Sequence, residues 1–207
     1  MTPVSVAERG KRERTKAQNR ATILDAARDV FAELGYGAAT VRDVVRRTDL
    51  AAGTFYNYFP DKEAVLRALV EENAAVIRGR LRAARGAATT REQFVRDGYH
   101  VYFAYVLEDR STFELMRRNA ETIRELIHEP ALGAGVDDLL ADLRRAIDSG
   151  LLPALDADYM AAAMAGVGIE VGMRMVEREP PDVEAATAFA TDLFLGAIER
   201  MERAARA

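Results

Sequence analysis

Apolar side chains recur every three or four residues along most of the chain, which is the period of an amphipathic helix. The first such run, from Ile23 to Leu34, ends at Gly35, and it predicts a helix over 16–34. Val, Ile and Thr are scattered, and apolar and polar residues do not alternate over any long stretch, so strands are not expected. The pattern therefore predicts an all-α fold.

A short second helix is predicted directly after Thr40. Asp43 follows three residues later, so the pair can form a capping box, and three valines supply the apolar face. The helix is limited to about eight residues by Asp49, a residue type that tolerates the left-handed backbone of a tight turn. Two short helices joined by a tight turn are therefore expected here.

The third predicted helix, 52–59, places Phe55 and Phe59 four residues apart on one face, where they are expected to be core. Pro60 ends it, and Asp61 can cap a long helix that begins at Lys62. Turn residues divide the remainder into five further predicted helices, which makes about nine in total: 90–107, 111–127, 136–148, 156–178 and 182–205.

The net charge of −4 is distributed unevenly along the chain. Residues 1–62 hold eleven Lys and Arg against eight Asp and Glu, whereas residues 63–207 hold eighteen against twenty-five. This asymmetry favours a basic N-terminal part that meets a polyanion. Residues 1–15 are interpreted as a flexible basic arm, which either reaches DNA or only confers solubility. The arm and its continuation hold Arg9, Lys11, Arg12, Arg14, Lys16 and Arg20.

Several function classes are disfavoured by what the sequence lacks. There is no cysteine, and neither histidine, His100 or His128, has a carboxylate four residues away, so no metal site or cofactor is expected. No glycine-rich phosphate loop or catalytic dyad is present, and no enzymatic activity or catalytic residue is predicted. The charged N-terminus and the short apolar runs predict a soluble, cytoplasmic protein with no membrane partner.

Two short helices joined by a tight turn form a helix-turn-helix, whose second helix can lie in the DNA major groove. The stretch from Thr40 to Leu66, with Gly-Thr-Phe-Tyr-Asn-Tyr-Phe-Pro-Asp-Lys at its centre, resembles the signature of the TetR family of transcriptional regulators. The resemblance covers about residues 16–66. It implies a helix-turn-helix DNA-binding domain at 16–62, followed by a larger helical effector-binding and dimerisation domain at 63–207.

Candidate DNA contacts follow from the chemistry of this stretch. The hydroxyls of Tyr56 and Tyr58 can donate to phosphate, although both rings are also compatible with half-buried packing. A cation at a helix start, as at Lys62, is unfavourable against the helix dipole unless an anion such as phosphate approaches. Side chains of helices two and three can reach base edges. The predicted DNA-binding residues are Thr40, Arg42, Ala52, Gly53, Thr54, Tyr56, Asn57, Tyr58 and Lys62.

The start of the third helix departs from the family pattern. Ala51, Ala52 and Gly53 occupy places where the family commonly has polar base-reading side chains. Thymine-methyl contacts, close backbone approach and DNA shape are left to supply part of the specificity. Ala51 also lacks the oxygen that would cap the helix.

The last two predicted helices are candidates for dimerisation. Glycines and alanines cluster between residues 161 and 172, which indicates that another helix approaches closely, either within the chain or from a second copy. The family resemblance implies a four-helix interface from the last two helices of each subunit. The predicted interface residues are Gly168, Gly172, Phe189, Leu193, Phe194 and Ile198.

The family resemblance also implies a small-molecule pocket among the middle helices. Aromatic and methionine side chains there favour an unidentified apolar or aromatic effector, although such a stripe is also typical of ordinary core. Asn119, Tyr99 or Arg117 would be polar anchors. The predicted effector residues are Tyr99, Tyr102, Phe103, Phe113, Met116, Asn119, Ile123 and Met164.

The resulting hypothesis is a homodimeric, ligand-responsive repressor that binds a palindromic operator in double-stranded DNA. An effector would release it by favouring a subunit spacing other than about 34 Å, one turn of DNA. The alternative is a helical protein-interaction module that does not bind DNA. The alternative predicts weak, salt-insensitive behaviour toward DNA.

Overall fold

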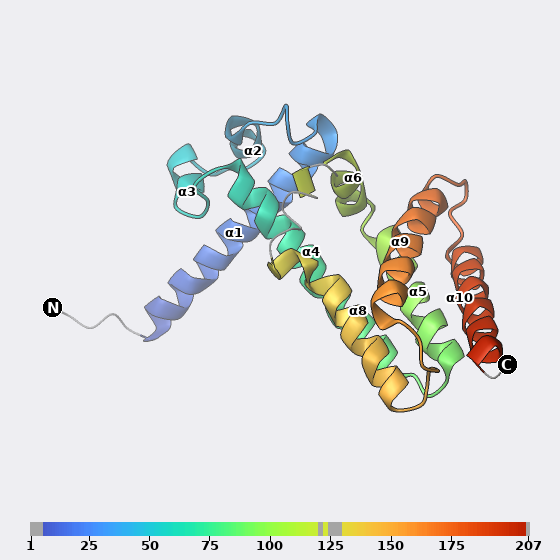
Figure 1. Cartoon of the computed structure of the whole chain (residues 1–207). Helices are drawn as coiled ribbons and strands as arrows, with labels where there is room; N and C mark the ends of the chain where they lie inside the picture. Colours follow the sequence, from blue (N-terminus) through green and yellow to red (C-terminus); the bar gives the residue numbers. More distant parts are fainter. Residues whose placement is uncertain (1–5, 120–121, 124–129, 206–207) are drawn as a thin grey trace. The chain divides into compact units, whose positions relative to one another are not determined.

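The computed structural model describes residues 6–119, 122–123 and 130–205, and every element within them is a helix (Figure 1). The all-α prediction is therefore confirmed. Contacts divide the chain into two compact units. The first unit comprises the described residues of Met1–Glu72 and Ser111–Leu126, and the second those of Asn73–Arg110 and Ile127–Ala207.

The first unit contains α1 (Val6–Leu34), α2 (Val41–Arg46), α3 (Ala52–Tyr56), the beginning of α4 (Lys62–Ala87) and most of α6 (Arg110–Arg118). Its core is built from the apolar face of α1 and from the helices that follow. Val30 and Phe31 are buried on α1, as are Val44 on α2 and Phe55 on α3. The residues that recur at helical spacing in the sequence are therefore the buried ones.

The second unit contains the remainder of α4 with α5 (Arg91–Glu108), α8 (Pro130–Asp148), α9 (Ala157–Val176) and α10 (Val183–Ala205). Helix α10 packs against α5 and α9, and α8 packs against α9. The Tyr99 ring stacks on Phe103 and on Phe194, with centroids 5.7 and 5.8 Å apart. A buried ion pair joins α4 to α8, with Arg85 Nε 2.6 Å from Asp142 Oδ2.

The helix bounds differ from the predicted ones by more than two residues in four places. Helix α1 begins at Val6, so residues 6–15 of the predicted arm are helical. Helix α3 ends at Tyr56 instead of 59, and α6 ends at Arg118 instead of 127. Helix α8 begins at Pro130 instead of 136, because a proline fits the first helical position, where no N–H donor is needed.

No helix in the described part of the chain is long and apolar enough to cross a membrane. The same residues hold no cluster of three His, Asp or Glu that could bind a metal ion. His128 lies outside the described residues.

Candidate nucleic-acid interface

Helix α2 begins with the predicted capping box. Asp43 N donates to Thr40 Oγ1 at 3.3 Å, while Thr40 N and Thr40 Oγ1 donate to Asp43 Oδ2 at 3.0 and 2.5 Å. The hydrogen bonds from Thr40 hold the pKa of the Asp43 carboxyl below its ordinary value. The start of α2 is therefore fixed by side chains only three residues apart.

The turn between α2 and α3 is closed by Thr48, which sequence reasoning missed. Its hydroxyl donates to the Val45 carbonyl at 2.9 Å and accepts from Leu50 N at 3.2 Å. No non-glycine residue in the described part of the chain has positive φ, so the left-handed turn expected at Asp49 is wrong. The threonine side chain supplies the bonds that close the turn.

Helix α3 has no side-chain cap, as the alanine at Ala51 predicts. The side of α3 that faces the protein interior is apolar. Phe55 is 1% exposed, and Phe59, just beyond the end of the helix, is also buried, so the prediction that both belong to the core is confirmed. Tyr56 is 58% exposed. The other predicted DNA-contacting residues of this segment are either exposed, namely Ala52, Gly53 and Asn57, or half-buried, namely Thr54 and Tyr58.

Gly53 lies in open space at the start of α3. A Cβ added there would meet no atom within 4 Å, so packing within the chain does not require a glycine. A backbone without a side chain lets another molecule approach closely. The surface of Ala52 and Gly53 is therefore smooth and free of charge.

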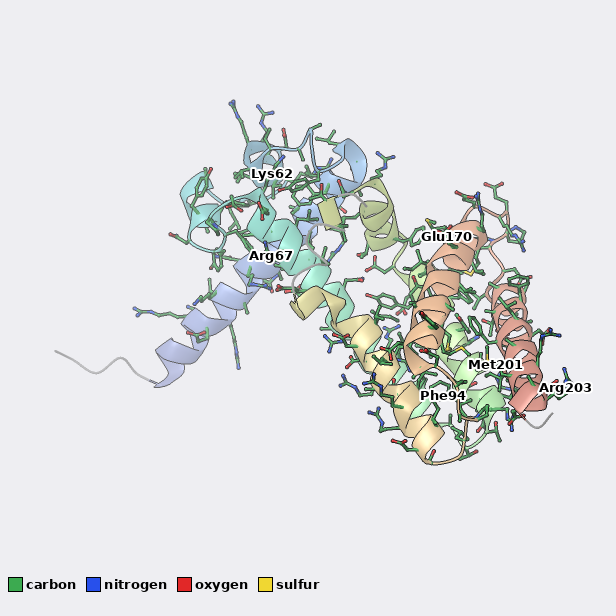
Figure 2. The ribbon with its side chains drawn as sticks, in the orientation of Figure 1. Lys62, Arg67, Phe94, Glu170, Met201 and Arg203 are labelled. Carbon is green, nitrogen blue, oxygen red and sulfur yellow. The ribbon has the colours of Figure 1, made fainter. Side chains whose placement is uncertain are left out.

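The structure places Lys62 differently from its predicted role as a phosphate contact. Figure 2 marks its position at the start of α4. Its Nζ donates to the carbonyls of Tyr36 at 2.8 Å, Ala39 at 2.9 Å and Gly37 at 3.4 Å, and it lies 4.4 Å from the centroid of the Tyr36 ring. An ammonium has three N–H donors. All three already have carbonyl acceptors, so a phosphate would have to displace one of them.

Most of the exposed cations of the first unit lie on α1 and α2. Arg42 is exposed on the first turn of α2. Along α1 the exposed side chains include Lys11, Arg12, Arg14 and Lys16. Arg20 is ion-paired with Glu72 and lies 5.5 Å from the centre of the Phe59 ring, whereas the side chain of Arg9 is outside the described part.

The glycines predicted to approach a second subunit are packed within the second unit. A Cβ on Gly168 would lie 3.6 Å from the Tyr99 ring, and one on Gly172 would lie 3.4 Å from the Tyr102 ring. Phe194 and Ile198 are also buried. By contrast, Phe189 and Leu193 on α10 are 60% and 47% exposed. Only these last two of the six predicted interface residues are substantially exposed.

The predicted effector residues are divided between the units. Tyr99, Tyr102, Phe103 and Met164 lie together in the second unit, where Tyr99 Oη donates to the Met164 carbonyl at 2.9 Å. Burial raises the pKa of Tyr102 to about 12 and also raises that of Tyr99. Phe113, Asn119 and Ile123 belong to the first unit, and the side chains of Met116 and Arg117 are outside the described part.

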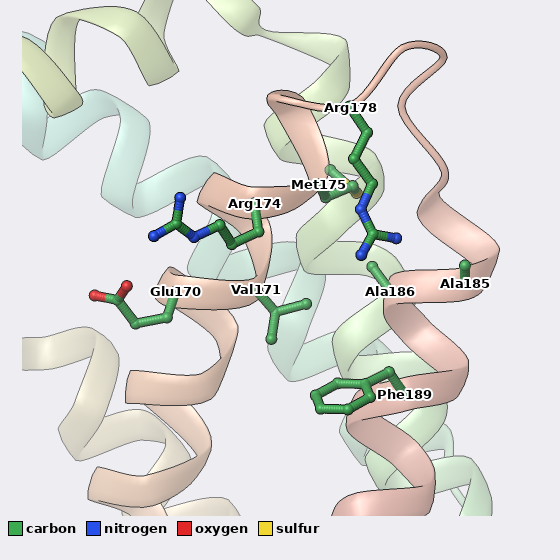
Figure 3. Close-up of a pocket in the computed structure, with 8 residues that line it drawn as sticks. All are labelled: Glu170, Val171, Arg174, Met175, Arg178, Ala185, Ala186 and Phe189. Carbon is green, nitrogen blue, oxygen red and sulfur yellow. The ribbon is translucent and has the colours of Figure 1, made fainter.

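A groove of about 390 Å³ lies between α9 and α10 (Figure 3). Its wall is partly apolar, with Met175 and Phe189, and partly basic. It is lined by Glu170, Val171, Arg174, Met175, Arg178, Ala185, Ala186 and Phe189. None of the predicted effector residues lines this groove.

Comparisons with known proteins agree with the helix-turn-helix. Residues 23–69 match the family model described as "Bacterial regulatory proteins, tetR family". The chain is 30% identical over 130 residues to the HTH-type transcriptional repressor Rv1474c of Mycobacterium tuberculosis, covering 63% of each chain. It is 31% identical over 129 residues to the HTH-type transcriptional repressor AcnR of Corynebacterium efficiens, covering 62% of each. The alignments thus span less than two thirds of these relatives.

Solved structures show the same architecture over more of the chain. The fatty acid degradation regulator FadR from Bacillus halodurans superposes with a TM-score of 0.75 and 25% identity, covering 84% of this chain and 93% of that one. FadR from Bacillus subtilis, solved in complex with stearoyl-CoA, gives a TM-score of 0.74 at 23% identity, covering 84% and 96%. The latter likeness is one of fold.

The fold and the exposed α3 surface define a helix-turn-helix protein. Residues 23–69 match the family model of the TetR family of bacterial regulatory proteins, and the chain is similar in sequence and fold to regulators of this kind. These relatives are transcriptional regulators, which agrees with the prediction that the chain is not an enzyme.

Proposed function

We propose that the protein is a transcriptional repressor that binds a palindromic operator as a homodimer and is released by a small molecule. The observation that carries the proposal is α3, a helix that buries Phe55 and presents Tyr56 and Asn57 to solvent within the region that matches the family. A helix fixed on one side and polar on the other can enter the major groove.

The exposed side chains divide into two kinds of DNA contact. Tyr56 and Arg42 reach the phosphate backbone, where hydroxyls and guanidinium groups position a protein without reading sequence. Asn57 and Thr54 reach base edges, since an amide or hydroxyl can donate and accept there. Thr40 and Tyr58 make further contacts to the phosphate backbone. The uncharged surface formed by Ala52 and Gly53 meets thymine methyl groups or the DNA backbone.

The basic face of α1 adds affinity that does not depend on sequence. Lys11, Arg12, Arg14 and Lys16 are exposed there, and cations release condensed counterions when they neutralise phosphates. A steep loss of affinity with salt is therefore expected. The competing protein-interaction module would bind DNA weakly and with little salt dependence.

The dimer is proposed to form through the exposed faces of α9 and α10. Ile169, Phe189 and Leu193 are large apolar side chains exposed on these helices. Ala162, Gly166 and Gly196 are exposed beside them and are small enough to let a second helix approach. Gly168 and Gly172 support the interface indirectly, by seating α9 on the aromatic rings of α5.

An apolar or aromatic effector is proposed to act by population shift. The dimer has one conformation in which the spacing of its two α3 helices fits the operator and another in which it does not. A ligand that binds the second conformation more tightly lowers operator affinity, to an extent set by the difference between its affinities for the two conformations. The similarity to regulators of the TetR family and the aromatic side chains of α5 support this proposal.

Selection of bound duplexes from a random library tests the DNA-binding proposal. We expect a two-fold symmetric consensus, with affinity that falls steeply as salt is raised. Tyr56→Phe should weaken binding to all duplexes alike, whereas Asn57→Ala should change the preference at particular base pairs. The absence of any consensus at low salt would instead support the interaction module.

A further inference from the structure

The loop from Gly35 to Ala39 leads from α1 directly into the capping residue of α2. Gly35 has φ of 78°, a left-handed conformation that glycine adopts readily, and its N–H donates to the Phe31 carbonyl at 3.1 Å. Ala39 N donates to the Gly35 carbonyl at 3.1 Å. The position of Thr40, and with it the start of α2, is therefore set by this loop.

One side of the loop is held by the C-terminal end of α6. Asn119 is 5% exposed, and its Oδ1 accepts a hydrogen bond from Tyr36 N at 2.6 Å. Its Nδ2 donates to the Leu115 carbonyl at 2.7 Å, which fixes the orientation of the amide. Next to it, Arg118 Nη1 donates to the Glu33 carbonyl at 2.9 Å.

The other side of the loop is held by the start of α4. The Lys62 ammonium donates to the carbonyls of Tyr36, Gly37 and Ala39, as described above. Tyr36 therefore has its N–H bonded to Asn119, directly after α6, and its carbonyl bonded to Lys62 of α4. A donor and an acceptor of one residue are held by side chains from two helices that are far apart in the sequence.

We propose that Asn119 and Lys62 are positioning residues that hold the 35–39 loop, and through it the start of α2, in the geometry that meets DNA. This assigns Asn119 to the DNA-binding unit instead of to an effector pocket, and Lys62 to the backbone of its own chain instead of to phosphate. The inference rests on the proposed function for its effect on DNA, but its structural part is measurable without DNA.

Removing the Asn119 amide leaves the Tyr36 N–H without an acceptor in a part-buried place. An unsatisfied buried donor is costly, so the loop should open to water. The backbone of residues 36–40 would then sample more conformations, and the side chains of α2 would meet DNA in the bound geometry for a smaller fraction of the time. All duplexes should be affected alike, because no base contact is removed.

The experiment measures amide hydrogen exchange of residues 34–40 in the full chain, and binding to a random-sequence duplex of about three helical turns at low salt. The variants are Asn119→Ala and Lys62→Met, the latter of which keeps an apolar stem without the ammonium. Asn119→Asp keeps an oxygen that can accept from Tyr36 N. Asn73→Ala is the matched control, since Asn73 Nδ2 donates to Tyr105 Oη at 2.6 Å in the second unit.

We expect Asn119→Ala and Lys62→Met each to speed exchange of the loop amides by about tenfold and to weaken duplex binding several-fold. Asn119→Asp keeps the acceptor for Tyr36 N but loses the donor to the Leu115 carbonyl, so it should speed Tyr36 exchange less than Asn119→Ala does, and Asn73→Ala should leave both readouts unchanged. If Asn119→Ala does not fold, Lys62→Met decides the matter through the same amides.

Unchanged exchange of the loop amides in folded Asn119→Ala and Lys62→Met would overturn the positioning role. So would faster exchange in Asn119→Ala with duplex binding fully retained. The proposed function can also fail by itself. If the unmodified protein binds no duplex while the loop amides exchange faster in the two variants, the proposed function is rejected and the structural role of Asn119 and Lys62 stands.

Discussion

Helices α2 and α3 lie next to each other in the chain but are stabilised in different ways. Helix α2 has a complete capping box between Thr40 and Asp43, whereas α3 begins at Ala51 without any side-chain cap. What α3 has instead is Phe55, buried at its centre, and Phe59 directly beyond its end. Helix α2 therefore combines a side-chain cap with the burial of Val44, whereas α3 depends on burial without a cap, so the two should respond to different substitutions.

The largest expected effect is that of Phe55→Ala. Deleting a buried aromatic ring removes its transfer free energy and leaves a cavity, at a cost of about 3–5 kcal/mol in the free energy of unfolding. Denaturant unfolding of the full chain measures this, and DNA binding should be lost with it. The matched control is Asn57→Ala, an exposed position that should change stability by less than about 0.5 kcal/mol. Equal losses in the two variants would contradict an α3 held by burial.

The second expected effect is that of Thr40→Ala, which removes the cap of α2 and should cost about 1 kcal/mol of stability. The chain offers a close control in Thr90, which forms the same type of capping box with Gln93 at the start of α5. Thr90→Ala should cost a similar amount of stability without weakening DNA binding. If it weakened binding as much as Thr40→Ala does, binding would depend on overall stability and not on the start of α2.

Ala51→Ser is expected to raise the stability of the fold, by less than the preceding variants lower it. A serine hydroxyl at this position can accept from a backbone N–H in the first turn of α3, adding the missing cap and about 0.5–1 kcal/mol of stability. Differential unfolding against Ala51→Val, which offers no oxygen, isolates the capping contribution. A gain shared by both variants would mean that the cap is not what α3 lacks.

The smallest effect concerns pH. The hydrogen bonds from Thr40 lower the pKa of Asp43 in the folded protein. The ionised carboxylate therefore stabilises the folded state fully above the ordinary carboxyl pKa of about 3.9, and this contribution is lost as pH falls through the lowered pKa. Titration of the Asp43 carboxyl by NMR measures it directly. In Thr40→Val the pKa of Asp43 should rise toward the ordinary value; an unchanged pKa would assign the shift to the backbone N–H of residue 40 and the neighbouring arginines.

The parts of this molecule that the sequence predicts correctly are those set by near neighbours. The capping box needs only residues 40 and 43, and the burial of Phe55 and Phe59 follows from their spacing. The roles proposed here for Asn119 and Lys62 differ from their sequence-based predictions for the opposite reason. The partner of Asn119 is 83 positions away, and that of Lys62 is a set of backbone carbonyls, which have no sequence signature.

Helix packing explains in the same way why the surroundings of the predicted interface residues could not be read from the sequence. Composition identifies Gly168 and Gly172 as places of close approach, but it does not say whether the approaching group comes from the same chain. The structure places Tyr99 and Tyr102 there. The exposure of Phe189 and Leu193, beside the buried Phe194, likewise depends on which face of α10 meets α5.

The unit that carries α2 and α3 is assembled from two segments of chain, with the whole of α5 between them. A chimeric regulator that borrows only residues 1–72 would therefore leave behind the amide that accepts from Tyr36 and the guanidinium that donates to Glu33. A graft that also brings residues 111–119 keeps both. Exchange of DNA specificity between such proteins, in the laboratory or in evolution, is thus constrained to substitutions on the exposed face of α3 or to a two-segment transplant.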